Sequence, residues 1–265
     1  MITCGLDLGA GTVKAVLLED GKNIIGKDIL KTGGRPADSA EKLLEKLFTD
    51  VGIKRSEVEY LSTTGFSRYL YKGRDLQLSD ITTNAKGAHY LFSKTTTVLD
   101  IGTQSTRAIY TSETGKVTKF NFTEKCAAGA GRFVERCSKY LQVPMSDMGP
   151  MALKASNPQQ ISSVCAVLAE TEIINLIATE IPISDIVYGV FISIANRAVT
   201  LARRVGMKPE LTLTGGLVNS IGMVKALEQI TGLKVNIDPL GHYSGAIGAS
   251  LLSYQRVQQL KAQIA

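Results

Sequence analysis

The chain has 265 residues, of which 44% are hydrophobic and 20% charged, with a net charge of +6 at neutral pH. This length suits one large domain or two ordinary ones, and the composition is typical of a globular protein. The four cysteines follow no leader, the basic residues are scattered, and no run of about 18 apolar residues occurs. We therefore expect a cytoplasmic protein without a disulfide framework, a membrane span or a nucleic-acid partner.

The first part of the chain is predicted to be a β-hairpin sheet with two helices. Alternating apolar residues indicate a strand at 2–8, which places Cys4 on one of its faces. A tight turn follows, and Asp20-Gly21 makes the next hairpin turn. The expected elements are strands at 2–8, 15–18, 23–30 and 60–63, and helices at 40–51, capped by Asp38 or Ser39, and at about 84–92.

The pattern of the opening hairpin occurs a second time from Val98 to Ile109. Five positions match at a constant offset of 93: Asp7 with Asp100, Gly9 with Gly102, Lys14 with Arg107, Ala15 with Ala108, and Val16 with Ile109. This weak repeat predicts two similar halves, each opening with a hairpin. We assign residues 1–95 to one half and 96–265 to the other, with the option that the terminal helix packs back on the first.

Two cysteines in the second half each stand just before an expected helix. Cys126 precedes a Gly-rich turn and an amphipathic helix at 132–141, and Cys165 precedes an apolar helix at 167–177. Free N–H groups and the positive end of the helix dipole favour a thiolate or an anionic cluster there. Cys4 and Cys137 lie among apolar residues and are expected in the core. The residues alone leave open that Cys126 and Cys165 are unreactive as well.

Three glycine turns predict a nucleotide site. Two follow Asp7 and Asp100, and the third, Gly215-Gly216, follows a strand expected at 211–214. Unhindered backbone amides can surround a phosphate, while a carboxylate holds a metal-bound water. One such turn is common in any hairpin, but three favour a nucleotide cleft. The remaining expected elements are a helix at 186–205, a strand at 235–237 and a closing helix with small residues at 245–250.

These turns resemble the phosphate-1, phosphate-2 and adenosine motifs of the actin and sugar-kinase ATPase fold. C-A-A-G-A-G-R-F at 126–133 and S-S-V-C-A-V-L-A-E-T-E at 162–172 resemble, more specifically, the activator ATPases of 2-hydroxyacyl-CoA dehydratases and the ATPase subunits of benzoyl-CoA reductase. The likeness covers nearly the whole chain, including T-T-G-F-S-R at 63–68 and G-A-I-G-A-S-L at 245–251. It implies an α/β fold of two actin-like lobes, a duplicated ribonuclease H-like fold, with the nucleotide cleft between them.

The resemblance also implies roles for single residues. The implied catalytic residues are Asp7, Asp100 and Gln104. The implied ATP and Mg²⁺ contacts are Gly9, Ala10, Gly11, Thr12, Lys14, Gly102, Thr103, Gly215, Gly216 and Asn219. Cys126 and Cys165 would bind an iron–sulfur cluster.

By resemblance, the protein hydrolyses ATP and passes one low-potential electron from a [4Fe–4S] cluster to a partner iron–sulfur reductase or dehydratase. A ferredoxin or flavodoxin would supply the electron, and the protein would work under anaerobic conditions. A [4Fe–4S] cluster generally takes four thiolates, and each chain offers two candidates. Two chains sharing one cluster, as a homodimer or as a heterodimer with a sister subunit, satisfy this count.

One loop departs from the family pattern. Activators usually have D-I-G-G-Q-D where this chain has Asp100-Ile101-Gly102-Thr103-Gln104-Ser105. The change bears on the hydrolysis rate more than on nucleotide binding. Two alternatives therefore stay open: a non-hydrolysing regulatory subunit, motivated by Thr103 and Ser105, and a small-molecule kinase of the same fold, which gives the paired cysteines no role.

Overall fold

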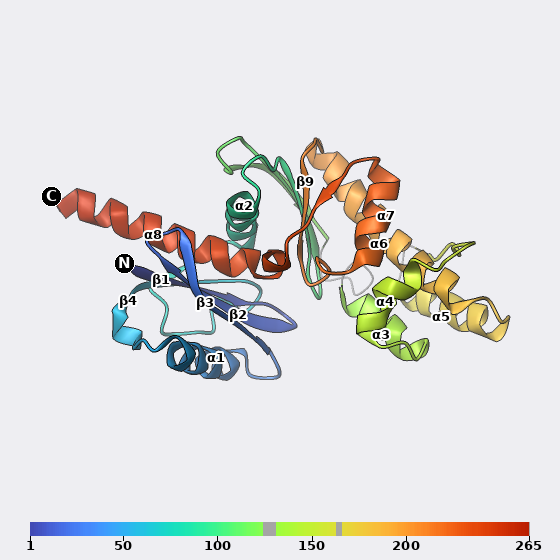
Figure 1. Cartoon of the computed structure of the whole chain (residues 1–265), viewed down its shortest axis with the longest axis horizontal. Helices are drawn as coiled ribbons and strands as arrows, with labels where there is room; N and C mark the ends of the chain where they lie inside the picture. Colours follow the sequence, from blue (N-terminus) through green and yellow to red (C-terminus); the bar gives the residue numbers. More distant parts are fainter. Residues whose placement is uncertain (124–130, 163–165, 265) are drawn as a thin grey trace. The chain divides into compact units, whose positions relative to one another are not determined.

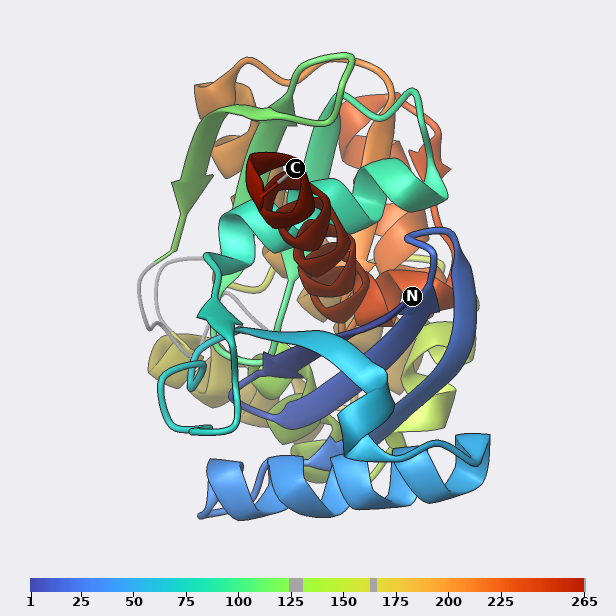
Figure 2. The same cartoon turned by 90° about the vertical axis from the view of Figure 1, so that its left-hand side faces the viewer.

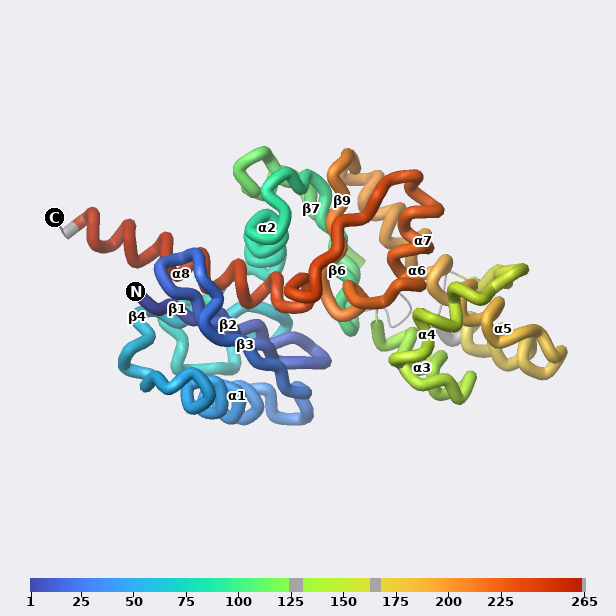
Figure 3. Tube along the Cα trace, viewed as in Figure 1, coloured from blue at the N-terminus to red at the C-terminus, as the bar shows by residue number. Residues whose placement is uncertain are grey.

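The computed structural model describes residues 1–123, 131–162 and 166–264. These residues form two compact units. The first unit consists of Met1–Lys94, Ser112–Val117 and Leu240–Ala265, and the second of Thr95–Thr111 and Thr118–Pro239. The chain therefore starts in the first unit, forms the second, and returns to the first for its terminal helix (Figure 3).

The first unit contains a mixed sheet with strand order β3-β2-β1-β4-β5. Its strands are β1 (Ile2–Leu8), β2 (Thr12–Glu19), β3 (Asn23–Lys31), β4 (Val58–Thr64) and β5 (Leu76–Gln77). β1 and β2 form an antiparallel hairpin in which Asp7 lies opposite Lys14, and β4 runs parallel to β1. The first of the two hairpins expected from the sequence therefore begins on β1, the central strand of this sheet.

Helices cover both faces of this sheet (Figures 1 and 2). The helix α1 (Pro36–Val51) packs on the face that buries Leu17, while α8 (Ser244–Ile264) packs on the face that buries Val16 and Leu18. Alternation along β2 thus supplies apolar side chains to two core layers. The helix α2 (Asp80–Leu91) packs against α8, and short 3₁₀ turns lie at Arg55–Glu57 and Pro239–Tyr243.

The start of α1 differs from the prediction. Neither Asp38 nor Ser39 caps it, because the helix already begins at Pro36 with Arg35 in the N-cap position. Proline suits the first helical position, where its missing N–H would have no partner in the helix. Asp38 lies in the first turn, where the helix dipole favours a carboxylate.

The second unit repeats the sheet topology with strand order β10-β9-β6-β7-β8. Its strands are β6 (Thr97–Ile101), β7 (Thr106–Thr111), β8 (Val117–Phe122), β9 (Leu211–Gly215) and β10 (Val235–Asn236). β6 and β7 form a hairpin in which Asp100 lies opposite Arg107, and β9 runs parallel to β6. The two similar halves predicted from the weak sequence repeat are confirmed at the level of strand pairing.

The helices of the second unit are α3 (Gly131–Tyr140), α4 (Met145–Ala152), α5 (Ala166–Ala178), α6 (Ile183–Val205) and α7 (Ile221–Thr231). Periodicity predicted α3, α5 and α6 but neither α4 nor α7. By length and composition α6 resembles a membrane span, although 78% of its most apolar window is buried inside the structure. Phe191 and Ile194 of α6 belong to the core that also contains Leu99 of β6, so α6 is a core helix of this unit.

Candidate functional site

The turn between β1 and β2 holds the first group of predicted site residues. Gly9 N–H donates to the carbonyl oxygen of Thr12 at 3.1 Å and closes the turn. Lys14 Nζ lies 3.1 Å from Asp7 Oδ2, and only 10% of the lysine side chain and 15% of the aspartate side chain are exposed. The hydroxyl of Thr32, directly after β3, donates to the Gly9 carbonyl at 2.7 Å. The predicted residues Ala10, Gly11 and Thr12 complete this turn.

The turn between β6 and β7 reproduces this geometry in the second unit. Gly102 N–H donates to the Ser105 carbonyl at 3.0 Å, as Gly9 does to Thr12. Arg107 Nη1 donates to Asp100 Oδ2 at 2.8 Å, as Lys14 does to Asp7. Thr103 and Gln104 lie half-buried in this turn. A basic side chain therefore partners the carboxylate in both loops.

A Thr-Gly step after a parallel strand faces each carboxylate. Thr64 of β4 lies opposite Asp7, and Thr214 of β9 lies opposite Asp100. The following residues, Gly65 and Gly215, have φ of 90° and 89°.

Both glycines are required by the space as well as by the backbone conformation. A Cβ on Gly65 would stand 2.3 Å from Asp7 Oδ1, and a Cβ on Gly215 would stand 2.7 Å from Asp100 Oδ1. Gly215 was predicted from the sequence, whereas Gly65 was missed. The signal was present as the same Thr-Gly pair in T-T-G-F and L-T-G-G.

The first loop also has neighbours from the end of the chain. A Cβ on Gly245, in the first turn of α8, would lie 3.1 Å from Asp7 Oδ2. His242 lies just before this helix, and burial together with the nearby Lys14 charge lowers its pKa to about 4, although Asp7 opposes the shift. His242 is therefore neutral at neutral pH and leaves the charge balance of the loop to Asp7 and Lys14.

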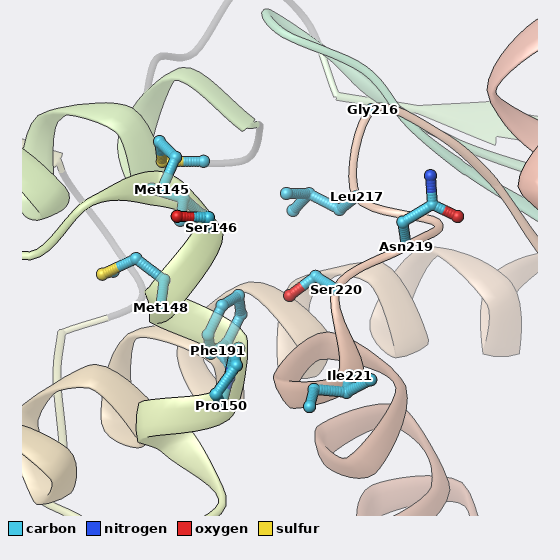
Figure 4. Close-up of a pocket in the computed structure, with 12 residues that line it drawn as sticks. Met145, Ser146, Met148, Pro150, Phe191, Gly216, Leu217, Asn219, Ser220 and Ile221 are labelled. Atoms are coloured by element: carbon cyan, nitrogen blue, oxygen red, sulfur yellow. The ribbon is translucent and has the colours of Figure 1, made fainter.

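A cavity of about 430 Å³ lies in the second unit beside the third glycine turn. Gly216, Leu217 and Asn219 line it from the loop between β9 and α7, and Met145 and Ser146 line it from α4. Leu217 points across the cavity toward Met145 and Ser146 (Figure 4). Gly216 N–H donates to the Ile101 carbonyl at 2.9 Å, which joins this loop to the end of β6. A mostly apolar pocket with a few polar groups suits a flat organic ring.

The cysteines divide into two pairs. Cys4 and Cys137 are fully buried, and burial raises the pKa of each thiol to about 12. Their predicted place in the core is confirmed. Cys126 and Cys165 lie outside the described residues. Within 1–123, 131–162 and 166–264, no group of three or more His, Cys, Asp or Glu side chains is arranged to hold a metal ion.

The predicted residues thus form two groups within the described chain. Asp7, Gly9, Ala10, Gly11, Thr12 and Lys14 lie in the first unit, and Asp100, Gly102, Thr103, Gln104, Gly215, Gly216 and Asn219 lie in the second. Each group combines a carboxylate, a basic side chain that forms an ion pair with it, and a glycine turn. Such a combination can bind phosphate oxygens through amides and position a metal-bound water.

The chain is similar over nearly its whole length to one family of known proteins. Residues 4–253 match the BadF/BadG/BcrA/BcrD ATPase family. The activator of lactoyl-CoA dehydratase from Anaerotignum propionicum is 34% identical over 98% of this chain and 100% of its own length. A benzoyl-CoA reductase subunit from Thauera aromatica is 37% identical over 98% of this chain and 95% of its own.

A solved structure agrees with these sequence matches. The activator of the 2-hydroxyisocaproyl-CoA dehydratase from Clostridium difficile, with bound ADPNP, has a TM-score of 0.94 and 29% identity. The alignment covers 100% of this chain and 98% of that one, which confirms the predicted α/β fold class. The chain therefore belongs to the BadF/BadG/BcrA/BcrD ATPase family.

Proposed function

We propose that the protein is an ATP-dependent activator that passes one low-potential electron to a partner iron–sulfur reductase or dehydratase. The observation that carries this proposal is the full-length match to dehydratase activators in a chain that has Cys126 and Cys165 shortly before α3 and α5 in its sequence. A small-molecule kinase would share the fold but leave both cysteines without a role. A non-hydrolysing subunit is not favoured either, because the family is an ATPase family.

The two hairpin loops supply the phosphate and Mg²⁺ contacts in this proposal. Asp7, Asp100 and Gln104 would hold Mg²⁺ and its water, and the glycine turns would donate backbone N–H groups to the phosphates. The cavity beside Gly216 and Asn219 takes the adenine ring. Support comes from the closed geometry of both turns and from the fixed partners of both carboxylates.

The departure at Thr103 and Ser105 leaves this arrangement standing. Ser105 closes the second turn through its backbone carbonyl, so the loop does not need a carboxylate there to keep its shape. Asp100 remains and is held by Arg107. We therefore infer that the loop keeps nucleotide binding and that any cost of the missing carboxylate falls on the rate of hydrolysis.

The donor set of the chain fits a cluster shared by two chains. Cys4 and Cys137 are buried with raised pKa values, so they are poor thiolate ligands. Cys126 and Cys165 are the remaining thiols, and four thiolates would require a homodimer or a heterodimer with a sister subunit. When bound, the [4Fe–4S] cluster would receive an electron from a ferredoxin or flavodoxin and supply it to the partner enzyme. We place the protein in the cytoplasm of an anaerobically growing cell.

The test is anaerobic purification followed by measurement of iron, sulfide and visible absorption. We expect the wild type to carry iron and acid-labile sulfide, and Cys126→Ala and Cys165→Ala each to lose both. Cys137→Ala removes a buried thiol and is the matched control that keeps the iron. Full iron in Cys126→Ala would contradict the assignment, and ATP turnover that requires a small acceptor in colourless protein would favour the kinase.

A further inference from the structure

Thr32 contacts the turn between β1 and β2 at two points. Its N–H donates to the Gly11 carbonyl at 3.0 Å, and its hydroxyl donates to the Gly9 carbonyl at 2.7 Å. It directly follows β3, whose last residue, Lys31, pairs with Thr12 of β2. Only 3% of Thr32 is exposed. One buried residue thus holds both glycine carbonyls of the first hairpin loop.

Thr32 is itself held from α1. The hydroxyl of Ser39, near the start of α1, donates to the Thr32 carbonyl at 2.9 Å. This bond spans Gly33 and Gly34, where an added Cβ would meet no atom within 4 Å. The branched Cβ of a threonine also restricts the rotation that would move its hydroxyl. The hydroxyl of Thr32 is therefore fixed in its direction toward the loop.

The two bonds from Thr32 determine which way the neighbouring N–H groups of the loop point. In a planar trans peptide the C=O and the N–H point in opposite directions. The Gly9 carbonyl belongs to the same peptide as the Ala10 N–H, and the Gly11 carbonyl to the same peptide as the Thr12 N–H. Because both carbonyls point toward Thr32, both of these N–H groups point away from it.

We infer that Thr32 is a positioning residue for nucleotide binding, which fixes the Ala10 and Thr12 N–H groups in the direction of the phosphates. This role rests on the proposed function, in which the loop contacts the phosphates. Thr32 acts through the loop, because its hydroxyl, N–H and carbonyl are all used in bonds to the loop and to α1. Donors that are already oriented bind an anion without the cost of ordering the loop.

Replacing the hydroxyl tests this role. Thr32→Val keeps the shape of the side chain and removes the donor to the Gly9 carbonyl, whereas Thr32→Ser keeps the donor. We expect Thr32→Val to bind ADPNP about five- to tenfold more weakly, as the loss of one hydrogen bond of typical strength would cause. Thr32→Ser should stay within about twofold of the wild type. Calorimetry on the full-length protein with Mg²⁺ measures the affinities.

Thr49→Val is the matched control for the loss of a threonine hydroxyl. The Thr49 hydroxyl also donates to a backbone carbonyl, that of Glu45, at 2.8 Å. Both residues lie in α1 at exposed positions away from the hairpin loop. We expect Thr49→Val to bind ADPNP with the wild-type affinity. A melting curve shows for each variant that it is folded.

The direction of the N–H groups is tested through the Ala10 amide. In protein labelled with ¹⁵N-alanine, the Ala10 resonance is identified by its absence from Ala10→Ser. We expect saturating ADPNP to shift this resonance in the wild type and in Thr32→Ser. The shift in Thr32→Val should be smaller even at saturation, because the N–H no longer has a fixed direction toward the phosphates. A variant that is merely less stable would show the full shift once it is saturated.

Three results would overturn the role of Thr32. The first is an Ala10 resonance that saturating ADPNP leaves unshifted in the wild type, and this measurement decides alone if Thr32→Val does not fold. The second is wild-type affinity for ADPNP in Thr32→Val. The third is a weaker affinity in Thr32→Val together with the full Ala10 shift at saturation. A wild type that binds no ADPNP would instead overturn the proposed function.

Discussion

The carboxylate of Asp100 has a fixed orientation. Its Oδ2 accepts from Arg107 at 2.8 Å, and its Oδ1 accepts from the Thr214 hydroxyl at 3.4 Å. Only 7% of the side chain is exposed, and Gly215 leaves the space beside Oδ1 free of a side chain. Fixed outer partners orient a carboxylate that holds a metal-bound water, which supports the role proposed for Asp100.

Replacing this carboxylate should separate catalysis from binding. We expect Asp100→Asn to bind ADP but to hydrolyse ATP about 100-fold more slowly, because a neutral amide holds a metal-bound water less firmly than a carboxylate does. Phosphate release with Mg²⁺ present is the measurement, after a melting curve has shown that the variant is folded. Asp38→Asn, at an exposed position of α1, should hydrolyse ATP at the wild-type rate. Wild-type turnover in Asp100→Asn would remove Asp100 from the catalytic residues.

Single residues of the candidate site were predictable to different degrees. Asp7 and Asp100 could be paired because their surroundings match at one offset in the sequence. Gly65 has the same Thr-Gly pair as Gly215, but its place beside Asp7 depends on parallel pairing between β1 and β4, which are separated in the sequence by β2, β3 and α1. Such a contact depends on tertiary pairing of distant segments, which short-range spacing does not reveal.

At the scale of elements, α8 approaches its neighbours through glycines. A Cβ on Gly5 of β1 would lie 1.9 Å from the Ala246 carbonyl oxygen, and a Cβ on Gly248 would lie 1.8 Å from that of Thr83 in α2. The hydroxyls of Thr3 and Ser250 are hydrogen-bonded at 2.9 Å in the same interface. The backbone of α8 therefore packs directly on β1 and α2, and the small residues at 245–250 allow this close approach.

A single methyl group should disrupt this packing. Alanine favours a helix over glycine by about 1 kcal/mol, so Gly248→Ala would stabilise an isolated helix. In the protein the added Cβ meets the backbone of α2, and we expect the free energy of unfolding to fall by about 1–3 kcal/mol. Denaturant unfolding measures it, and Gly34→Ala, where a Cβ would meet nothing within 4 Å, is the control with no loss. Equal midpoints for both variants would show that α8 moves away at no cost.

Most elements with regular apolar spacing were predicted, whereas α4, which is shaped by its surroundings, was not. In α4, Gly149 and Pro150 both disfavour a helix, but Met148 and Ala152 are buried in the core and hold the turn in place. The buried positions of α7, Met223, Ala226 and Leu227, do have helical spacing, so this helix could have been found. Packing decided α4, whereas α7 was overlooked.

At the scale of the molecule, the two units share a sheet topology but differ in what joins its strands. Between β3 and β4 the chain forms α1 and a short 3₁₀ turn. At the equivalent place, between β8 and β9, it forms α3, α4, α5 and α6. Cys126 and Cys165 both belong to this longer connection. In the proposed function, the loops of the two similar sheets would bind the nucleotide, and the added helical connection of the second unit would carry the cysteines for electron transfer.

The count of thiols predicts the assembly. Because each chain offers only Cys126 and Cys165, one cluster with four thiolate ligands requires two chains. We expect the anaerobic protein to have twice the 28.4 kDa mass of one chain and to contain about four iron atoms per pair of chains. Native mass spectrometry measures both quantities in one sample. Cys165→Ala should lose the iron, and its dimer should weaken because the cluster no longer joins the chains. Iron-loaded protein with the mass of a single chain would contradict the shared cluster, and iron only after addition of a sister subunit would replace the homodimer by a heterodimer.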